Sequence, residues 1–245
     1  YNDVPAARAA FDTLGERIAF VLLEPVAANI GVIPPAPGFL GTLRACCDRT
    51  GAVLVFDEVI TGFRLGPGGA QGRFGVAPDL TCLGKVIGGG LPVGAFGGRR
   101  DLMELLAPDG PVYQAGTLSG SPVTVAAGLA TLDALAADPP YARLEALTAS
   151  LCEGLTEAAR SAGVPVTVNR AASLFSVFFT AELVTDSVAA RRQDTGAYAR
   201  FFRAMIEQGV HPAPSAYEAW FLSAAHSEDD VAETIRAAAA ALSLA

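Results

Sequence analysis

The stretch Leu80-Thr81-Cys82-Leu83-Gly84-Lys85-Val86-Ile87-Gly88-Gly89-Gly90 decides the fold. A short apolar run delivers one lysine onto a glycine-rich bend, and a second apolar run follows at residues 93–96. Short, continuous apolar runs bounded by glycines are typical of buried strands in a sheet that is covered on both faces. Lys85 is therefore predicted to stand at the C-terminal end of a strand, the edge where ligands collect in open parallel sheets.

A carboxylate closes another predicted strand upstream. Residues 53–56 are apolar, and Asp57 and Glu58 follow them. Successive side chains of a strand alternate, so Glu58 is expected to point away from Asp57. A lysine and a carboxylate at neighbouring strand ends suit pyridoxal phosphate, which needs an amine for a Schiff base and an anion for its pyridinium nitrogen. Taken alone, Asp57 is also explained as a polar residue that faces a loop.

Lys85 has two competing interpretations. Most lysines are solvated, but apolar residues on one side and glycines on the other favour a buried amine with a lowered pKa, which makes a better nucleophile. A phosphate-binding loop fails, because Val86 follows the lysine and no glycine stands at the required distance before Gly84. Lys85 is therefore predicted to be the nucleophile.

The order of predicted elements indicates two domains. In residues 1–162, helices and loops separate continuous apolar strands, which predicts an α/β large domain with a mostly parallel sheet. In residues 163–245 the pattern changes to short strands and helices, which predicts a small α+β domain. The expected strands are residues 18–23, 53–56, 80–83, 93–96, 164–168, 174–179 and 220–224, and the expected helices are residues 4–15, 39–50, 141–162 and 194–208, with a glycine-rich loop at 62–75.

A further helix is predicted to begin at Pro122, with Ser121 as its N-cap. Thr117 precedes this helix in Gly116-Thr117-Leu118-Ser119-Gly120. Hydroxyls and free backbone N–H groups at a helix N-terminus suit a phosphate. A simple capping loop explains the same residues equally well.

The composition excludes several classes of protein. The formal net charge of −8 argues against a nucleic-acid-binding surface, which would be basic. Glycine, proline or a charge interrupts each apolar run before it reaches the length of a membrane span. The four cysteines form no spaced CxxC pairs and the chain has two histidines, so no metal site is expected. Reduced thiols in a cytoplasmic protein are the expectation.

Together these segments resemble the class III aminotransferases of fold type I, a family of pyridoxal phosphate enzymes. Asp-Glu-Val at 57–59 and Gly-Lys at 84–85 are shared by the wider class. Gly-Gly-Ala-Gln-Gly at 68–72, Tyr-Gln-Ala-Gly-Thr-Leu-Ser-Gly at 113–120 and Tyr-Glu-Ala at 217–219 resemble its aminomutase branch. The similarity covers the whole chain.

The resemblance implies a role for each candidate site residue. Lys85 would form the Schiff base with pyridoxal 5′-phosphate and shuttle protons, and Asp57 would bind the pyridinium nitrogen. Asn29 would lie near the cofactor ring, and Glu218 near the substrate and the cofactor entrance. Thr117 would bind the cofactor phosphate of the neighbouring subunit, which implies a homodimer with shared active sites.

The implied reaction is an amino transfer within one molecule, from glutamate-1-semialdehyde to 5-aminolevulinate in tetrapyrrole (porphyrin) biosynthesis. The cofactor would pass through its pyridoxamine 5′-phosphate form. Another class III ω-aminotransferase, a racemase of the same fold and a catalytically inactive fragment are the alternatives. Family members carry a long N-terminal portion with further cofactor contacts, so residues 1–162 are expected to be a partial cofactor domain. We therefore expect weak or absent cofactor binding by the 245-residue chain alone.

Overall fold

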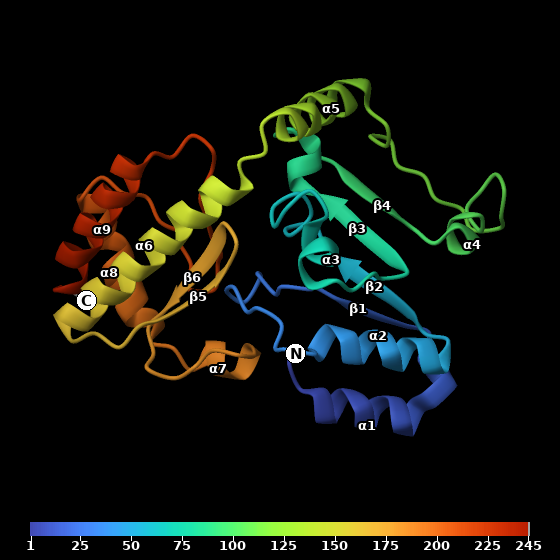
Figure 1. Ribbon diagram of the computed structural model, residues 1–245, viewed down its shortest axis with the longest axis horizontal. Helices are drawn as coiled ribbons and strands as arrows, with labels where there is room; N and C mark the ends of the chain where they lie inside the picture. Colours follow the sequence, from blue (N-terminus) through green and yellow to red (C-terminus); the bar gives the residue numbers. More distant parts are fainter. Residues whose placement is uncertain (245) are drawn as a thin grey trace. The chain divides into compact units, whose positions relative to one another are not determined.

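The computed structural model describes residues 1–244 and divides the chain into two compact units (Figure 1). The sheet unit comprises Asp3–Pro25 and Ala36–Pro139. The C-terminal unit comprises Tyr1–Asn2, Val26–Pro35 and the chain from Pro140 onward. The predicted domain boundary between residues 162 and 163 stays a prediction.

The sheet unit is built on a four-stranded sheet in the order β1-β2-β3-β4. The first three strands are parallel and β4 is antiparallel to β3, which confirms the predicted α/β fold with a mostly parallel sheet. Residues 85–93 connect β3 to β4, and they are fewer than the roughly dozen residues that a parallel crossover needs. The chain therefore reverses after β3, and β4 runs antiparallel to it. The strands are β1 (Phe20–Leu23), β2 (Val53–Asp57), β3 (Leu80–Gly84) and β4 (Gly94–Gly98).

One face of this sheet is covered by helices. Helix α2 (Phe39–Thr50) packs on β1 and β2, and α1 (Val4–Leu14) packs on α2 (Figure 1). Leu54 and Phe56 of β2 are completely buried. Helix α2 ends as predicted at Gly51, whose φ of 76° is the left-handed conformation that glycine adopts without strain.

The opposite face carries apolar side chains that are open to solvent. The register pairs Phe20 with Val53 and Leu22 with Val55, and side chains that pair across a ladder point to the same face. Phe20 is 60% exposed and Leu22 is 56% exposed. Asp57 lies on this face too, since its side chain has the same parity along β2 as those of Val53 and Val55.

Several short elements complete the sheet unit. Helix α3 lies within residues 62–75, so the prediction of an unbroken loop there is wrong. Its six residues include two glycines and show no helical periodicity, and their backbone is held instead by a distant side chain, as described below. The remaining elements are η1 (Gly15–Arg17), α3 (Gly69–Phe74), η2 (Lys85–Gly88), α4 (Arg100–Met103) and α5 (Pro122–Ala137).

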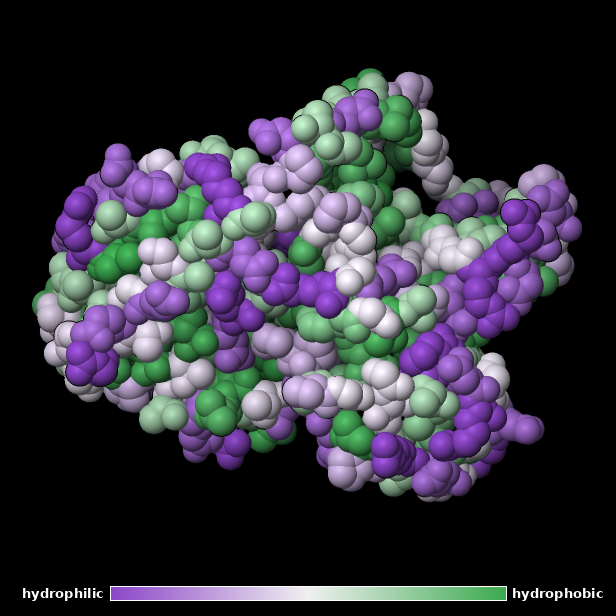
Figure 2. All heavy atoms as spheres, viewed as in Figure 1, coloured by the Kyte–Doolittle hydropathy of each residue, from purple (hydrophilic) through white to green (hydrophobic). Residues whose placement is uncertain are grey.

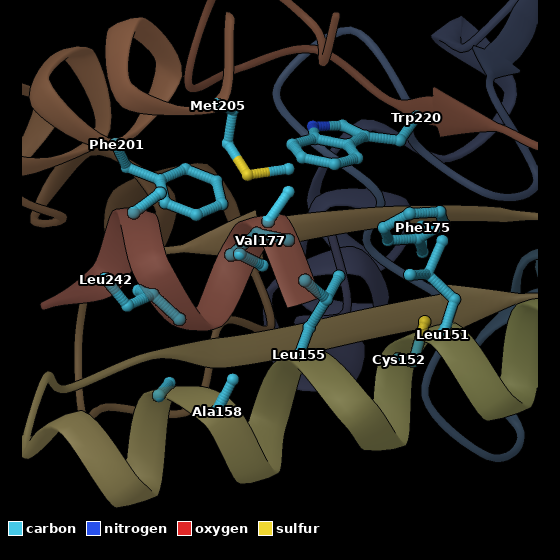
Figure 3. Close-up of a cluster of buried hydrophobic side chains, with 14 of the residues drawn as sticks. Leu151, Cys152, Leu155, Ala158, Phe175, Val177, Phe201, Met205, Trp220 and Leu242 are labelled. Carbon is cyan, nitrogen blue, oxygen red and sulfur yellow. The ribbon is translucent and has the colours of Figure 1, made fainter. Parts of the chain in front are cut away.

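The C-terminal unit packs helices against a three-stranded antiparallel sheet, ordered β5-β6-β7. All five residues of β6 are buried. Figure 3 shows its core, in which Phe175 and Val177 of β6 face Leu155 of α6 and Met205 of α8. The elements are α6 (Tyr141–Ala162), β5 (Thr167–Ala171), β6 (Leu174–Phe178), α7 (Ser187–Arg191), α8 (Thr195–Glu207), β7 (Trp220–Phe221) and α9 (Glu228–Leu242). Among residues 1–244, no helix has the length and apolarity that crossing a membrane requires.

Candidate active site

Asp57 and Lys85 lie at the same edge of the sheet. Asp57 is the last residue of β2 and pairs in register with Cys82, and Lys85 directly follows β3. Because β2 and β3 are parallel, both residues stand at carboxyl ends of neighbouring strands, where open α/β sheets bind ligands. Asp57 is half-buried, and one of its carboxylate oxygens accepts a hydrogen bond from the Val59 N–H at 3.0 Å. That turn fixes the direction of the carboxylate.

Lys85 has a left-handed backbone. Its φ of 47° is uncommon for a residue with a side chain, and such strain concentrates at functional sites. Lys85 is an exposed residue, so the expectation of a buried lysine is wrong. The reason is local, because Lys85 does not continue β3 but opens the turn η2 (Lys85–Gly88), and so leaves the sheet in which Gly84 is buried.

Lys85 is also the single lysine of the 245-residue sequence, in which Lys and Arg together number 17. Every other basic side chain of these two types is an arginine. A guanidinium stays protonated and cannot supply a neutral amine, whereas an ammonium group can lose its proton. The chain therefore keeps lysine only at the strand end next to Asp57. This signal is visible in the sequence itself, apart from any motif.

Thr117 lies in an exposed turn before α5. Its neighbours Gly116 and Leu118 line a cavity of about 390 Å³, which Ser121 and Thr124 of the α5 N-terminus also border. Ser121 stands at the N-cap as predicted, but its side chain makes no capping hydrogen bond. The start of this helix therefore offers backbone N–H groups beside a cavity, the arrangement that favours an anion.

Asn29 and Glu218 belong to the C-terminal unit, where one serine brings their segments together. The buried Ser176 hydroxyl donates to the Glu218 carbonyl at 2.9 Å and accepts from the Val32 N–H at 2.9 Å. The Gly31 N–H also donates to the Tyr217 carbonyl at 2.6 Å. These hydrogen bonds place Asn29 and Glu218 in neighbouring loops of one unit. Both residues are exposed.

The negative charge of Asp57 affects its register partner, Cys82. Burial raises the pKa of the Cys82 thiol, and the negative charge of Asp57 raises it further. A carboxylate at this strand end thus acts on the groups around it. Among residues 1–244, Asp57 forms no ion pair with an arginine or lysine, and its carboxylate accepts a hydrogen bond from the Val59 N–H.

A buried carboxylate, Asp79, stands at the opposite end of β3. It accepts hydrogen bonds from Arg44 at 2.8 Å, Arg99 at 2.9 Å and the Leu54 N–H at 2.7 Å. Burial alone would raise the pKa of Asp79, but the hydrogen bonds from Leu54, Arg99 and Arg44 lower it overall. This ion-pair cluster anchors the sheet far from Lys85 along the strand.

Comparison with known proteins assigns the family. The model of the family described as Aminotransferase class-III matches residues 4–230. The chain belongs to that family. A curated class III relative, glutamate-1-semialdehyde 2,1-aminomutase of Thermomicrobium roseum, is 59% identical over 243 residues. That alignment covers 99% of this chain and 56% of the relative, so the chain spans about half the length of the protein it matches.

Solved structures of class III enzymes share the fold. An omega-transaminase from Sphaerobacter thermophilus superimposes with a TM-score of 0.92 at 34% identity, over 100% of this chain and 56% of that one. A glutamate-1-semialdehyde-aminomutase from Pseudomonas aeruginosa PAO1, in complex with PMP, superimposes with a TM-score of 0.88 at 26% identity, over 100% and 56%. These similarities confirm the predicted fold of this class III chain.

Proposed function

We propose that this chain is the Lys85-bearing part of a pyridoxal phosphate enzyme that converts glutamate-1-semialdehyde to 5-aminolevulinate. The observation that carries the proposal is the single lysine of the sequence at the carboxyl end of β3, beside Asp57 at the end of β2. The identity of 59% to a glutamate-1-semialdehyde 2,1-aminomutase supports the choice of substrate.

The residues at this sheet edge fit the cofactor. A primary amine and a carboxylate are the two groups that pyridoxal phosphate uses for attachment and for keeping its ring nitrogen protonated. When bound, the cofactor supplies an electron sink for the carbanion formed as a Cα–H bond breaks. Asp57 would hold the proton on the ring nitrogen, because the turn at Val59 aims its carboxylate.

Lys85 has two tasks in this proposal. Its Nζ atom would hold the cofactor covalently before the substrate arrives. Once the substrate has displaced it, the free amine would take a proton from one carbon and return it to another. A single flexible amine can do both, because proton transfer needs only hydrogen-bond reach of each atom. The exposed position of Lys85 allows that movement.

The other candidate residues would bind and orient. We assign the cofactor phosphate to Thr117 and the α5 N-terminus, where backbone N–H groups border a cavity of about 390 Å³. Asn29 is assigned to the cofactor ring and Glu218 to the substrate and cofactor entrance. The hydrogen bonds of Ser176 hold the loops that carry Asn29 and Glu218, which supports a joint role for them.

We further propose a homodimer in which Thr117 serves the active site of the partner subunit. The segment around Thr117 carries large apolar side chains in water, with Tyr113 83% exposed and Leu118 71% exposed. The hydrophobic surface continues on α5, where Val123 is 71% exposed, and green residues gather over this helix in Figure 2. Exposed apolar surface of this kind marks protein–protein contacts.

A cytoplasmic location is part of the same proposal. Cys46, Cys47, Cys82 and Cys152 are all free thiols. Free thiols are normal where glutathione and thioredoxin keep cysteines reduced.

A second candidate function is ω-aminotransfer between two molecules. It is favoured by the TM-score of 0.92 to an omega-transaminase. Incubating the product of the complete gene with glutamate-1-semialdehyde, without any added amino acceptor, separates the two. We expect 5-aminolevulinate to form. A strict requirement for a keto acid would contradict the aminomutase and support the ω-aminotransferase, and a lack of turnover under both conditions would support an inactive protein.

A further inference from the structure

We propose that Glu58 is a positioning residue for the active site, acting through Asp57. Its carboxylate ties the loop between β2 and α3 to the sheet, and so fixes the strand end from which Asp57 projects. The inference rests on the proposed function, because it assigns Glu58 a part in binding the same cofactor. From the sequence alone, Glu58 is expected only to point away from Asp57.

Glu58 is 1% exposed and its carboxylate is saturated with hydrogen bonds. One oxygen accepts from the Ala70 N–H at 2.6 Å and from the Thr61 hydroxyl at 3.0 Å. The other accepts from the Gln71 side-chain amide at 2.9 Å and from the Gln71 N–H at 3.3 Å. All four donors are neutral and lie within residues 61–71. A carboxylate with each oxygen doubly engaged has little capacity left for chemistry, so its role is to hold this loop.

The same network reaches the strand that leads to Lys85. The Gln71 amide also lies 2.9 Å from the Thr81 hydroxyl on β3. The Glu58 N–H donates to the Cys82 carbonyl at 2.9 Å, which extends the β2–β3 ladder beyond Asp57. Glu58 is thus joined to β3 twice, through its backbone and through Gln71.

Two glycines are required for this arrangement. Gly69 begins α3 with a φ of 58°, and a Cβ atom there would collide with the Glu58 carboxylate. A Cβ on Gly62 would come within 2.7 Å of the Glu58 carbonyl oxygen. Either collision would displace the loop from Glu58. The close approach of the loop to Glu58 therefore explains the glycines at these two positions.

Packing alone does not hold the loop. A cavity of about 360 Å³ lies beside Glu58, lined by loop residues that include Gly62, Phe63 and Pro67. Phe63 has a φ of 56°, a strained value for an aromatic residue. Hydrogen bonds therefore help to hold this strained loop beside the cavity, and four of them reach the Glu58 carboxylate. If they are lost, the turn that aims Asp57 at the Val59 N–H is freed as well.

The test uses the product of the complete gene and three variants. Glu58→Gln replaces one carboxylate oxygen by an NH₂ group. This group would face the N–H and O–H donors that now bind the oxygen. Asp57→Asn is the reference for a lost pyridinium partner. Asp79→Asn is the matched control, since it also removes a buried carboxylate but at the opposite end of β3. For each, the dissociation constant of pyridoxal phosphate, the pH titration of its visible absorbance and the thermal unfolding temperature are measured.

We expect Glu58→Gln to weaken pyridoxal phosphate binding by about 10–100-fold, as substitutions behind a ligating residue do. Its absorbance titration should move in the same direction as that of Asp57→Asn. Asp79→Asn should lower the unfolding temperature and leave both cofactor measurements unchanged. Wild-type affinity and titration in Glu58→Gln, or equal changes in Asp79→Asn, would overturn the inference.

Thr61→Val keeps the test decisive if Glu58→Gln does not fold, because it removes one of the four donors with little change in volume. It should shift the titration in the same direction by a smaller amount, and an unchanged titration would then overturn the inference. A wild-type protein without visible cofactor absorbance would instead overturn the proposed function, and this inference with it.

Discussion

Asp57 and Cys82 are register partners across β2 and β3, and their side chains share one face of the sheet. Burial raises the pKa of the Cys82 thiol and the Asp57 charge raises it further, so less thiolate forms at a given pH. Asp57→Asn removes the charge and should lower this pKa. Alkylation of Cys82, followed by peptide mass spectrometry against pH, should therefore become faster at neutral pH in the variant.

Cys152 provides the internal control for that experiment. It lies in the C-terminal unit, and burial raises the pKa of its thiol to about 12. Its alkylation rate should be equal in the wild-type protein and in Asp57→Asn. An unchanged Cys82 rate in the variant would contradict the electrostatic coupling between the two residues.

Ser176→Ala should destabilise the C-terminal unit. The substitution removes the hydroxyl that bonds to the Val32 N–H and to the Glu218 carbonyl. Because a buried polar group without a partner costs about 1–3 kcal/mol, we expect a loss of about 2–4 kcal/mol in the free energy of unfolding, measured by urea denaturation. Ser161→Ala is the matched control, since its exposed hydroxyl bonds only Glu157 at 3.1 Å, and it should change stability by less than about 0.5 kcal/mol. Equal effects of the two substitutions would refute the bridging role of Ser176.

Asp79→Asn should reduce stability in a pH-dependent way. Hydrogen bonds from Leu54, Arg99 and Arg44 outweigh burial and lower the pKa of folded Asp79, whereas the unfolded carboxyl titrates near 3.9. A carboxyl whose pKa is lower in the folded than in the unfolded protein stabilises the fold at any pH above its pKa in the unfolded protein. This contribution is lost as the pH falls through the pKa of the folded protein. The wild-type protein should therefore exceed the variant by about 1–3 kcal/mol at neutral pH, with a difference that shrinks below about pH 4. A difference independent of pH would show that the ion pairs are not its source.

Most of the fold could be predicted from local sequence signals. The C-terminal ends of the helices at Phe39–Thr50 and Tyr141–Ala162 were predictable, because each helix is followed by a glycine, Gly51 or Gly163, in the left-handed conformation. Helix α3 was missed because its backbone is held by Glu58, which is distant in sequence. No local pattern could report that contact.

The candidate site was predictable to a similar degree. Asp57 and Lys85 could be placed at neighbouring strand ends, because apolar runs identify the strands and parallel strands share an edge. The exposure of Lys85 could not be foreseen, since it depends on the turn η2 that begins at Lys85 and takes this residue off the sheet. The network around Glu58 depends on side chains from three separate segments, which no spacing rule connects.

Shared active sites can be tested by mixing two inactive variants. Lys85→Ala and Thr117→Val should each lose most activity as homodimers. If Thr117 serves the partner subunit, a mixed dimer has one site with both residues intact. Subunit exchange at equal concentrations should then restore about one quarter of the wild-type activity. If both residues act within one subunit, no site in the mixture is intact and activity should not return.

The most direct test of the central claim is the identity of the residue that attaches pyridoxal phosphate. Borohydride reduction of the cofactor-loaded product of the complete gene, followed by digestion and mass spectrometry, locates the resulting pyridoxyl group. We predict a single modification, on Lys85, that is absent from Lys85→Ala. A pyridoxyl group on any other residue, or none in a protein that has bound the cofactor, would contradict the proposed function.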